Sequence, residues 1–195
     1  MMLGLEHDRG HFCHEHLRSI SFAKVVPFGD HRGRNCQDNE ISWFDWTRAS
    51  RNSDLVGFFR KAIAFTRRFP TLQRRQFPAG GDLDADGVPD IAWFGPDLDE
   101  PHWTDPNART LCFQVDSSER GEIVDAERLF FILNGHYETQ TVKLPQPGAS
   151  KAWFRAVDTS LRSGPDFADE GQEVRIDPPG FYIANPRTTV VLLAR

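Results

Sequence analysis

A run of amides, carboxylates and tryptophans between Asn35 and Trp46 is the stretch of this sequence best suited to chemistry. It reads Asn-Cys-Gln-Asp-Asn-Glu-Ile-Ser-Trp-Phe-Asp-Trp. Amide and carboxylate groups offer paired donors and acceptors to hydroxyl groups, and indole faces stack on flat, weakly polar ligand surfaces. We predict that a sugar is contacted by Asp38, Asn39, Trp43 and Trp46. The alternative is a polar loop that Trp43 and Trp46 anchor to the core.

Two other clusters have the composition of metal sites but lack the spacing. The first contains His7, His11, Cys13, His14 and His16. It fits no standard zinc pattern and has no second cysteine, so we expect a poorly ordered leader over residues 1–28 instead. Residues 80–90 begin like an EF-hand loop, but the position of its bidentate Glu is Trp93. A solvated Asx/Gly turn is the favoured interpretation there, and we expect neither a metal nor a cofactor.

The elements that must position any site begin with one amphipathic helix over residues 52–69. Its predicted apolar face contains Leu55, Phe58, Phe59, Ala62, Ile63, Thr66 and Phe69. These residues recur at three- and four-residue steps, which is the period of a helix with one buried face. Pro70 ends the helix, because the residue before a proline is driven out of helical backbone space.

After residue 90 the pattern changes to short apolar runs separated by turns that contain proline or glycine. The predicted strands are 91–94, 110–115, 128–134, 139–144, 152–157, 173–176 and 188–193. Strands of this length and spacing are typical of an antiparallel β-sandwich. Asn134-Gly135 is interpreted as a tight turn between two strands, and the run from Phe181 to Leu193 as a returning strand that closes a sheet.

Composition excludes several classes of function. The chain has 195 residues, 39% hydrophobic residues and a net charge of -5, which suits a globular protein and gives no reason to expect nucleic acid or an anionic membrane as partner. No apolar run approaches the length of a membrane span. The three cysteines, Cys13, Cys36 and Cys112, are widely spaced and unpaired in sequence, which favours a reducing, cytoplasmic setting.

The run from Cys36 to Trp46 resembles the block near the end of the catalytic barrel in bacterial glycogen debranching enzymes, the isoamylase-type members of the α-amylase superfamily. Residues 88–95 and 103–113 resemble the entry to the carboxyl-terminal β domain of those enzymes. The sequence departs from the family at His31, where a Gly-Asp-Glu turn has its Glu, and the loop that follows is several residues shorter.

The resemblance implies a mainly β fold in two parts. Residues 1–78 would be a short α/β remnant of a (β/α)8 barrel with one amphipathic helix, and residues 79–195 a C-terminal antiparallel β-sandwich domain. In the debranching enzymes that helix packs outside the barrel. Without a barrel its phenylalanines need another surface, and an exposed apolar face would promote association between chains.

The resemblance also implies a reaction, the retaining hydrolysis of α-1,6-glucosidic branch linkages in glycogen. Such enzymes cleave with a pair of carboxylates that flank the scissile bond, and in this family those acids lie on barrel strands upstream of the matched region. We therefore expect a C-terminal fragment of a glycogen debranching enzyme that is inactive alone, with glycogen as its α-glucan partner. The alternatives are a glycan-binding or assembly module of β-sandwich type, and the non-functional product of a truncated gene.

Overall fold

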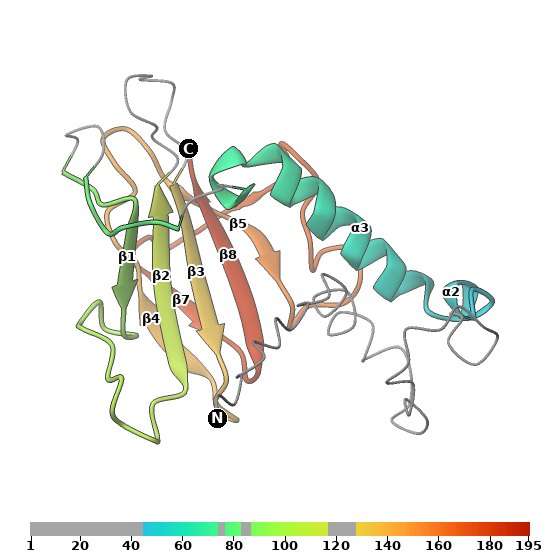
Figure 1. The fold of residues 1–195 in the computed structure, drawn as a ribbon, viewed down its shortest axis with the longest axis horizontal. Coiled ribbons are helices and arrows are strands. Elements are labelled where there is room, and N and C mark those ends of the chain that lie inside the picture. Colours follow the sequence, from blue (N-terminus) through green and yellow to red (C-terminus); the bar gives the residue numbers. More distant parts are fainter. Residues whose placement is uncertain (1–44, 74–76, 83–86, 117–127) are drawn as a thin grey trace, which may run out of the picture. The chain divides into compact units, whose positions relative to one another are not determined.

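The computed structural model describes residues 45–73, 77–82, 87–116 and 128–195, and it divides the chain into two compact units, 1–53 and 54–195. In the first unit the described part contains one short helix, α2 (Arg48–Arg51). The second unit contains helix α3 (Ser53–Arg68) from its second residue onward, the 3-10 helix η1 (Pro70–Gln73) and the strands, as Figure 1 shows.

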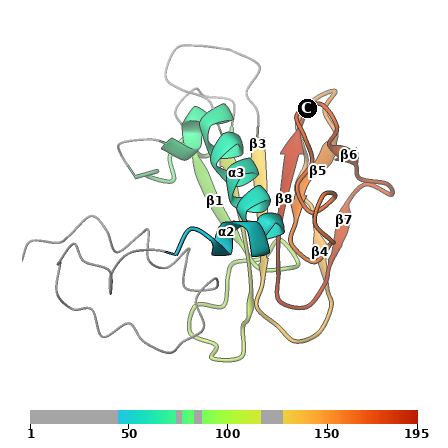
Figure 2. The ribbon, with the colours of Figure 1, turned by 90° about the vertical axis from the view of Figure 1, so that its right-hand side faces the viewer.

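The strands described in the structure form two antiparallel sheets. The large sheet has six strands in the order β1-β2-β3-β8-β5-β6, and the small sheet has two, β4 and β7. Their bounds are β1 (Ile91–Phe94), β2 (Thr110–Asp116), β3 (Arg128–Asn134), β4 (Gln140–Lys143), β5 (Trp153–Asp158), β6 (Val174–Arg175), β7 (Phe181–Ala184) and β8 (Thr188–Ala194). The small sheet covers one face of the large sheet and α3 the other, so the unit has three layers (Figure 2).

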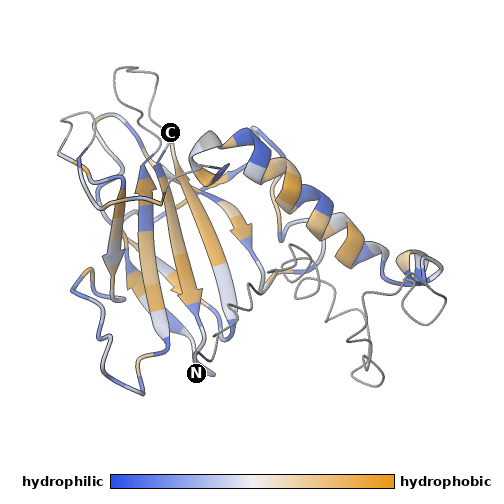
Figure 3. Ribbon diagram, viewed as in Figure 1, coloured by the Kyte–Doolittle hydropathy of each residue, from blue (hydrophilic) through white to orange (hydrophobic). Residues whose placement is uncertain are grey.

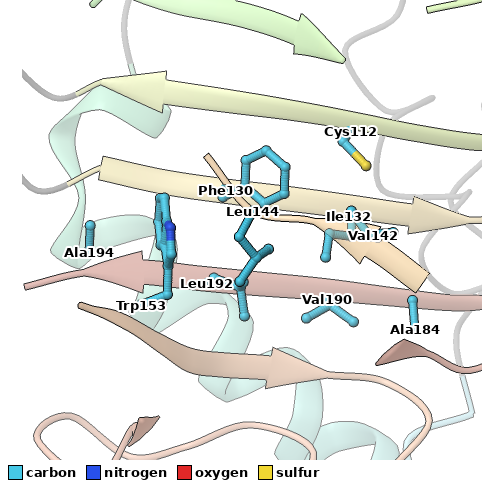
Figure 4. Close-up of a cluster of buried hydrophobic side chains, with 10 residues drawn as sticks. All are labelled: Cys112, Phe130, Ile132, Val142, Leu144, Trp153, Ala184, Val190, Leu192 and Ala194. Carbon is cyan, nitrogen blue, oxygen red and sulfur yellow. The ribbon is translucent and has the colours of Figure 1, made fainter. Parts of the chain in front are cut away.

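The space between the two sheets holds a dry apolar core. Its buried residues, labelled in Figure 4, are Cys112, Phe130, Ile132, Val142, Leu144, Trp153, Ala184, Val190, Leu192 and Ala194. Alternation along β4 explains the contribution of the small sheet, because Val142 is buried while Thr141 and Lys143 are exposed.

A second apolar core lies between α3 and the opposite face of the large sheet. Its buried residues are Phe69, Leu129, Ala156, Val157, Phe167, Val191 and Leu193, and Phe58 and Phe65 of α3 pack against them. Figure 3 shows that hydrophobic and hydrophilic residues alternate along α3, as expected of an amphipathic helix. Because both faces of the central strands are covered, β3 and β8 carry nearly continuous apolar runs rather than a clean alternation.

The mainly β fold and the antiparallel sandwich are confirmed by this arrangement. The helix predicted over 52–69 is α3, and its Phe58, Ala62 and Phe65 pack against the large sheet. The predicted apolar face is wrong at Ile63 and Thr66, which are exposed because they lie on the side of α3 away from the sheet. The barrel remnant stays a prediction, as does the boundary between 78 and 79, and most of the remnant falls outside the described residues. Helix α3, from Asp54 onward, belongs to the same compact unit as the sandwich.

The prediction of a tight hairpin turn at Asn134-Gly135 is wrong. The strand before it, β3, lies in the large sheet between β2 and β8, whereas the strand after it, β4, pairs with β7 in the small sheet. The side chain of Asn134 stabilises this crossing between sheets, since its Nδ2 donates to the carbonyls of Ala184 at 3.1 Å and Asn185 at 2.9 Å. Its Oδ1 accepts from the backbone N–H of His136 at 3.0 Å.

The run from Phe181 to Leu193 is also not one closing strand. It forms β7 in the small sheet and then β8, which lies in the middle of the large sheet between β3 and β5. The break falls at Asn185–Arg187, where Arg187 has a φ of 54°. A positive φ at a non-glycine residue is typical of a tight turn, and this turn carries the chain from one sheet to the other.

Candidate functional site

The residues predicted to contact sugar are described only in part. Asp38, Asn39 and Trp43 lie outside the described residues. Trp46 lies two residues before the start of α2 and is 74% exposed. An indole as open as this is accessible to a ligand and does not anchor the chain in a core. The sugar-contacting role of these four residues stays a prediction.

The sequence clusters with metal-like composition are likewise covered incompletely. Residues 7–16 lie outside the described part, and so do residues 83–86 of the acidic turn. The N–H of Gly87 donates to Asp82 Oδ2 at 2.9 Å, a bond between residues five apart that joins the two described edges of that turn. Within the described ranges, no group of three or more His, Cys, Asp or Glu side chains is placed to hold a metal ion.

The buried carboxylate of Asp158, at the end of β5, is held by hydroxyl groups. Its Oδ2 accepts from Tyr182 Oη at 2.6 Å, and its Oδ1 accepts from Ser160 Oγ at 2.7 Å and Thr188 Oγ1 at 3.1 Å. Burial opposes ionisation, but these bonds outweigh it and lower the pKa of Asp158. Burial and the bond to Asp158 raise the pKa of Tyr182 to about 12. The network ties β5, β7 and β8 together, so its role is structural.

A second buried carboxylate, Glu173, lies between two arginines. Its Oε1 accepts from Arg68 Nη1 at 2.7 Å and its Oε2 from Arg195 Nη1 at 2.8 Å. Burial raises the pKa of Glu173, but the bond from Arg68 and the charges of both arginines more than reverse this and lower it. Because Arg68 ends α3 and Arg195 follows β8, this carboxylate joins the helix to the sheet.

Cys112, the free cysteine that the structure describes, is not suited to nucleophilic chemistry. It is fully buried in the core between the sheets. Burial, with a smaller contribution from Asp99, raises the pKa of the Cys112 thiol to about 12. Since the thiolate is the nucleophilic form of cysteine, this residue is an apolar core residue.

Aromatic side chains cross the helix-facing side of the large sheet at its β1 margin. Trp93, Phe113 and Phe131 face one another in register across β1, β2 and β3, with centroids 5.0 Å apart between Trp93 and Phe113 and 4.5 Å between the two phenylalanines. We call these three residues the aromatic row. Trp103 packs edge-on against Trp93 at 5.9 Å. Trp93 is 43% and Trp103 is 63% exposed, so this end of the row meets solvent.

The described part of the chain also contains a cleft of about 600 Å³ at the β5–β6 margin of the sandwich. Its lining comes from the loop before β5 and from the segment between β6 and β7. The residues are Pro145, Gln146, Pro147, Lys151, Ala152, Trp153, Arg175, Ile176, Asp177, Pro179 and Gly180. The volume falls within the range of about 300–1,000 Å³ that is usual for small-ligand sites. We call it the margin cleft.

The walls of the margin cleft are fixed by hydrogen bonds. Trp153 is only 4% exposed, and its Nε1 donates to the Pro145 carbonyl at 2.7 Å. The N–H of Ile176 donates to the Trp153 carbonyl at 2.9 Å, and the N–H of Leu144 to the Gly180 carbonyl at 2.9 Å. Both lining segments are therefore tied to the sheets, and the cleft is preformed.

Sequence reasoning missed the margin cleft. Its two proline-containing segments, 145–147 and 177–180, were interpreted only as turns between strands. The available signal was their composition, because each carries a polar side chain, Gln146 or Asp177, between or beside prolines. Nothing in the sequence brings the two segments together, since that depends on the pairing of β5 with β6 and of β4 with β7.

Comparison with known proteins shows the family to which this fold belongs. The family model "Isoamylase, C-terminal" matches residues 90–193, which run from the residue before β1 to the penultimate residue of β8. The chain therefore belongs to the family of isoamylase C-terminal domains, and the predicted resemblance to isoamylase-type debranching enzymes is confirmed.

Individual relatives agree with this family. The chain is 28% identical to an isoamylase of Flavobacterium sp over 179 residues, covering 89% of the chain and 23% of the relative. It is 28% identical to the glycogen operon protein GlgX homolog of Mycobacterium tuberculosis over 154 residues, covering 70% of the chain and 21% of that protein. The chain thus spans less than a quarter of the length of these two relatives.

A solved structure supports the fold. The pullulanase from Bacillus acidopullulyticus superposes with a TM-score of 0.53 at 15% sequence identity, covering 85% of this chain and 16% of the pullulanase. At this identity the likeness concerns the fold alone. In the described part of the chain, no helix combines the length and the apolar composition required to cross a membrane.

Proposed function

We propose that this chain acts as the C-terminal β domain of an isoamylase-type debranching hydrolase that works on α-1,6-glucosidic branches of glycogen in the cytoplasm. The observation that carries the proposal is the family match over residues 90–193, which coincides with the sandwich. The names of the relatives, isoamylase and glycogen operon protein, supply the substrate class.

A domain exchange tests this role. Residues 90–193 replace their counterpart in the Flavobacterium isoamylase, and debranching of glycogen is measured by the release of linear chains. We expect the chimera to retain measurable activity and the same relative without the domain to lose it. A chimera that folds, by circular dichroism, but is as inactive as the truncated enzyme would contradict the proposal.

We further propose that the chain does not cleave glycogen by itself. Retaining glycosidases place two carboxyl groups about 5–5.5 Å apart across the scissile bond. The buried acids of the described residues serve the structure. Asp158 accepts from hydroxyls and Glu173 pairs with arginines. Asp116 pairs with Arg128 at 3.6 Å, and Asp90 accepts from the N–H groups of Ala79 at 3.0 Å and Gly80 at 2.7 Å. Among the residues that line the margin cleft, Asp177 is the single acid.

The assay for this second claim is direct. The purified chain is incubated with glycogen and with a branched dextrin, and linear chains are detected with a reducing-end reagent and by chromatography. We expect no release above the rate without protein, while an active isoamylase run in parallel degrades both substrates. Sustained release by the chain, copurifying with it, would refute the claim of inactivity.

A further inference from the structure

We infer that the margin cleft is a binding site for a linear α-glucan chain, separate from the segment that contains Trp46. The inference begins from the shape of the cleft. Its volume of about 600 Å³ accommodates a small ligand, and the bonds from Trp153 Nε1 to the Pro145 carbonyl and from the Leu144 N–H to the Gly180 carbonyl hold its two sides in place. A preformed cleft binds with little loss of conformational entropy.

Part of the lining of the margin cleft is apolar. It comes from the rings of Pro145, Pro147 and Pro179. Trp153 borders the cleft but is only 4% exposed, so it supports the wall through its bond to the Pro145 carbonyl, and the proline rings supply the carbon surface. The carbon–hydrogen faces of sugar rings are ligands for such surfaces, because they are flat and weakly polar.

Hydrogen-bond donors and acceptors form the rest of the lining of the margin cleft. Gln146, Arg175 and Asp177 line the cleft at exposed positions, and no hydrogen bond or ion pair joins their side chains to other described residues. An amide, a guanidinium and a carboxylate together supply donors and acceptors. Their polar groups are therefore available to the hydroxyl groups of an occupant.

The margin cleft contains charged groups of both signs, since Arg175 is cationic and Asp177 is anionic. A hydroxyl group can both donate and accept a hydrogen bond, so an uncharged, polyhydroxylated ligand can accept from the guanidinium and donate to the carboxylate at once. The step from an uncharged polyol to an α-glucan rests on the proposed function.

The test uses the full 195-residue chain with maltoheptaose, a linear α-glucan, as the probe. Binding is measured by isothermal titration calorimetry and by retardation in gels that contain glycogen. We expect Arg175→Ala and Asp177→Ala each to weaken binding about tenfold, because each removes a charged partner for the hydroxyl groups of the glucan; tenfold corresponds to about 1.4 kcal/mol. Both side chains are exposed, so the variants retain the fold.

Matched variants locate the site. Arg162→Ala removes an exposed arginine elsewhere on the same unit and leaves affinity within about twofold. Trp46→Ala also leaves it within about twofold if the margin cleft holds the glucan. Weakening by Trp46→Ala with no effect of Arg175→Ala and Asp177→Ala would overturn the inference and place the sugar at the other segment.

Two further outcomes contradict the inference without touching the proposed function. The first is no detectable binding of maltoheptaose at millimolar concentration, together with an active domain-exchange chimera. The second is equal binding of cellohexaose, a β-linked chain, which would show that the cleft does not select α-glucans. An inactive but folded chimera would instead refute the proposed function.

Discussion

The two margins of the large sheet differ on the side that faces α3. Toward the β5–β6 margin the second core is closed by α3, where Phe65 and Phe58 meet Phe167 edge-on at 5.5 and 5.8 Å and Phe69 is only 1% exposed. At the β1 margin the aromatic row ends in the half-open Trp93. The same kind of side chain is thus core at one margin and surface at the other.

Ion pairs reinforce the covered margin. Lys61 of α3 contacts Asp169 at 3.0 Å and donates to the Phe167 carbonyl at 2.9 Å, while Arg68 reaches Glu173. One helix is therefore attached along its length to the segment between β5 and β6. The comparison shows that coverage by α3, rather than the residue composition of the strands, determines which aromatic side chains of the sheet are buried.

The largest expected change in the free energy of unfolding is at the margin that α3 covers. Phe69→Ala should lower the free energy of unfolding by about 3–5 kcal/mol, because it removes a fully buried ring and leaves a cavity. Chemical denaturation followed by tryptophan fluorescence measures the change. Ile63→Ala, on α3 but 54% exposed, should change the free energy by less than about 0.5 kcal/mol. Similar losses for the two variants would mean that α3 is not packed as described.

The second-largest loss in the free energy of unfolding is expected at Glu173, whose carboxylate joins α3 to the end of β8. Glu173→Gln should cost on the order of 3 kcal/mol, since it removes the charge that two arginines share. Glu170→Gln is the matched control: Glu170 also contacts Arg68, at 3.5 Å, but its side chain is 77% exposed, and exposed pairs contribute about 0–1 kcal/mol. Equal costs for the two substitutions would contradict the buried position of Glu173.

A smaller effect, dependent on pH, is expected at Asp158. Its pKa is lowered from 3.8 in the folded protein, so its contribution is present above the unfolded-state pKa and is lost as pH falls through the folded-state pKa. Asp158→Asn should lower the free energy of unfolding by about 1–3 kcal/mol at pH 7. It should also make the free energy of unfolding fall less steeply as the pH drops below about 4. Urea unfolding at several pH values measures both quantities. An unchanged pH dependence in the variant would contradict the assignment.

The smallest effect is at the exposed margin. Trp93→Ala should cost about 1 kcal/mol, because the indole packs on Phe113 on one side and is half solvated on the other. Trp103→Ala, more exposed still, should cost about 0.5 kcal/mol. Thermal unfolding by circular dichroism compares them with Phe69→Ala. A loss at Trp93 as large as that at Phe69 would remove the difference between the two margins.

Much of the fold was predictable because local periodicity and burial agree. Apolar spacing in 52–69 gave α3, and the runs around Phe113 and Phe130 gave β2 and β3. The assignment of strands to sheets was not predictable, since β4 and β7 pair across many residues and Asn134 takes part in a crossing between sheets where a hairpin was expected. Local patterns carry no information about such long-range pairing.

The candidate site was less predictable than the fold. The exposed position of Trp46 is compatible with its predicted role, but the margin cleft arises only when segments around Gln146 and Asp177 meet. Lys61 and Arg68 lie outside the predicted apolar face of the helix, yet both pair with acids of the sandwich. Pairing of long basic side chains depends on tertiary neighbours that a helical pattern does not reveal.

The central structural claim is that α3, the large sheet and the small sheet form one cooperative unit. Hydrogen–deuterium exchange of the intact chain tests it most directly. We predict that amides of α3 between residues 57 and 68 exchange with the same free energy of opening as those of β3 and β8. Exchange of α3 at the rate of an isolated 16-residue helix, which is marginal in water, while the strands stay protected, would contradict the claim.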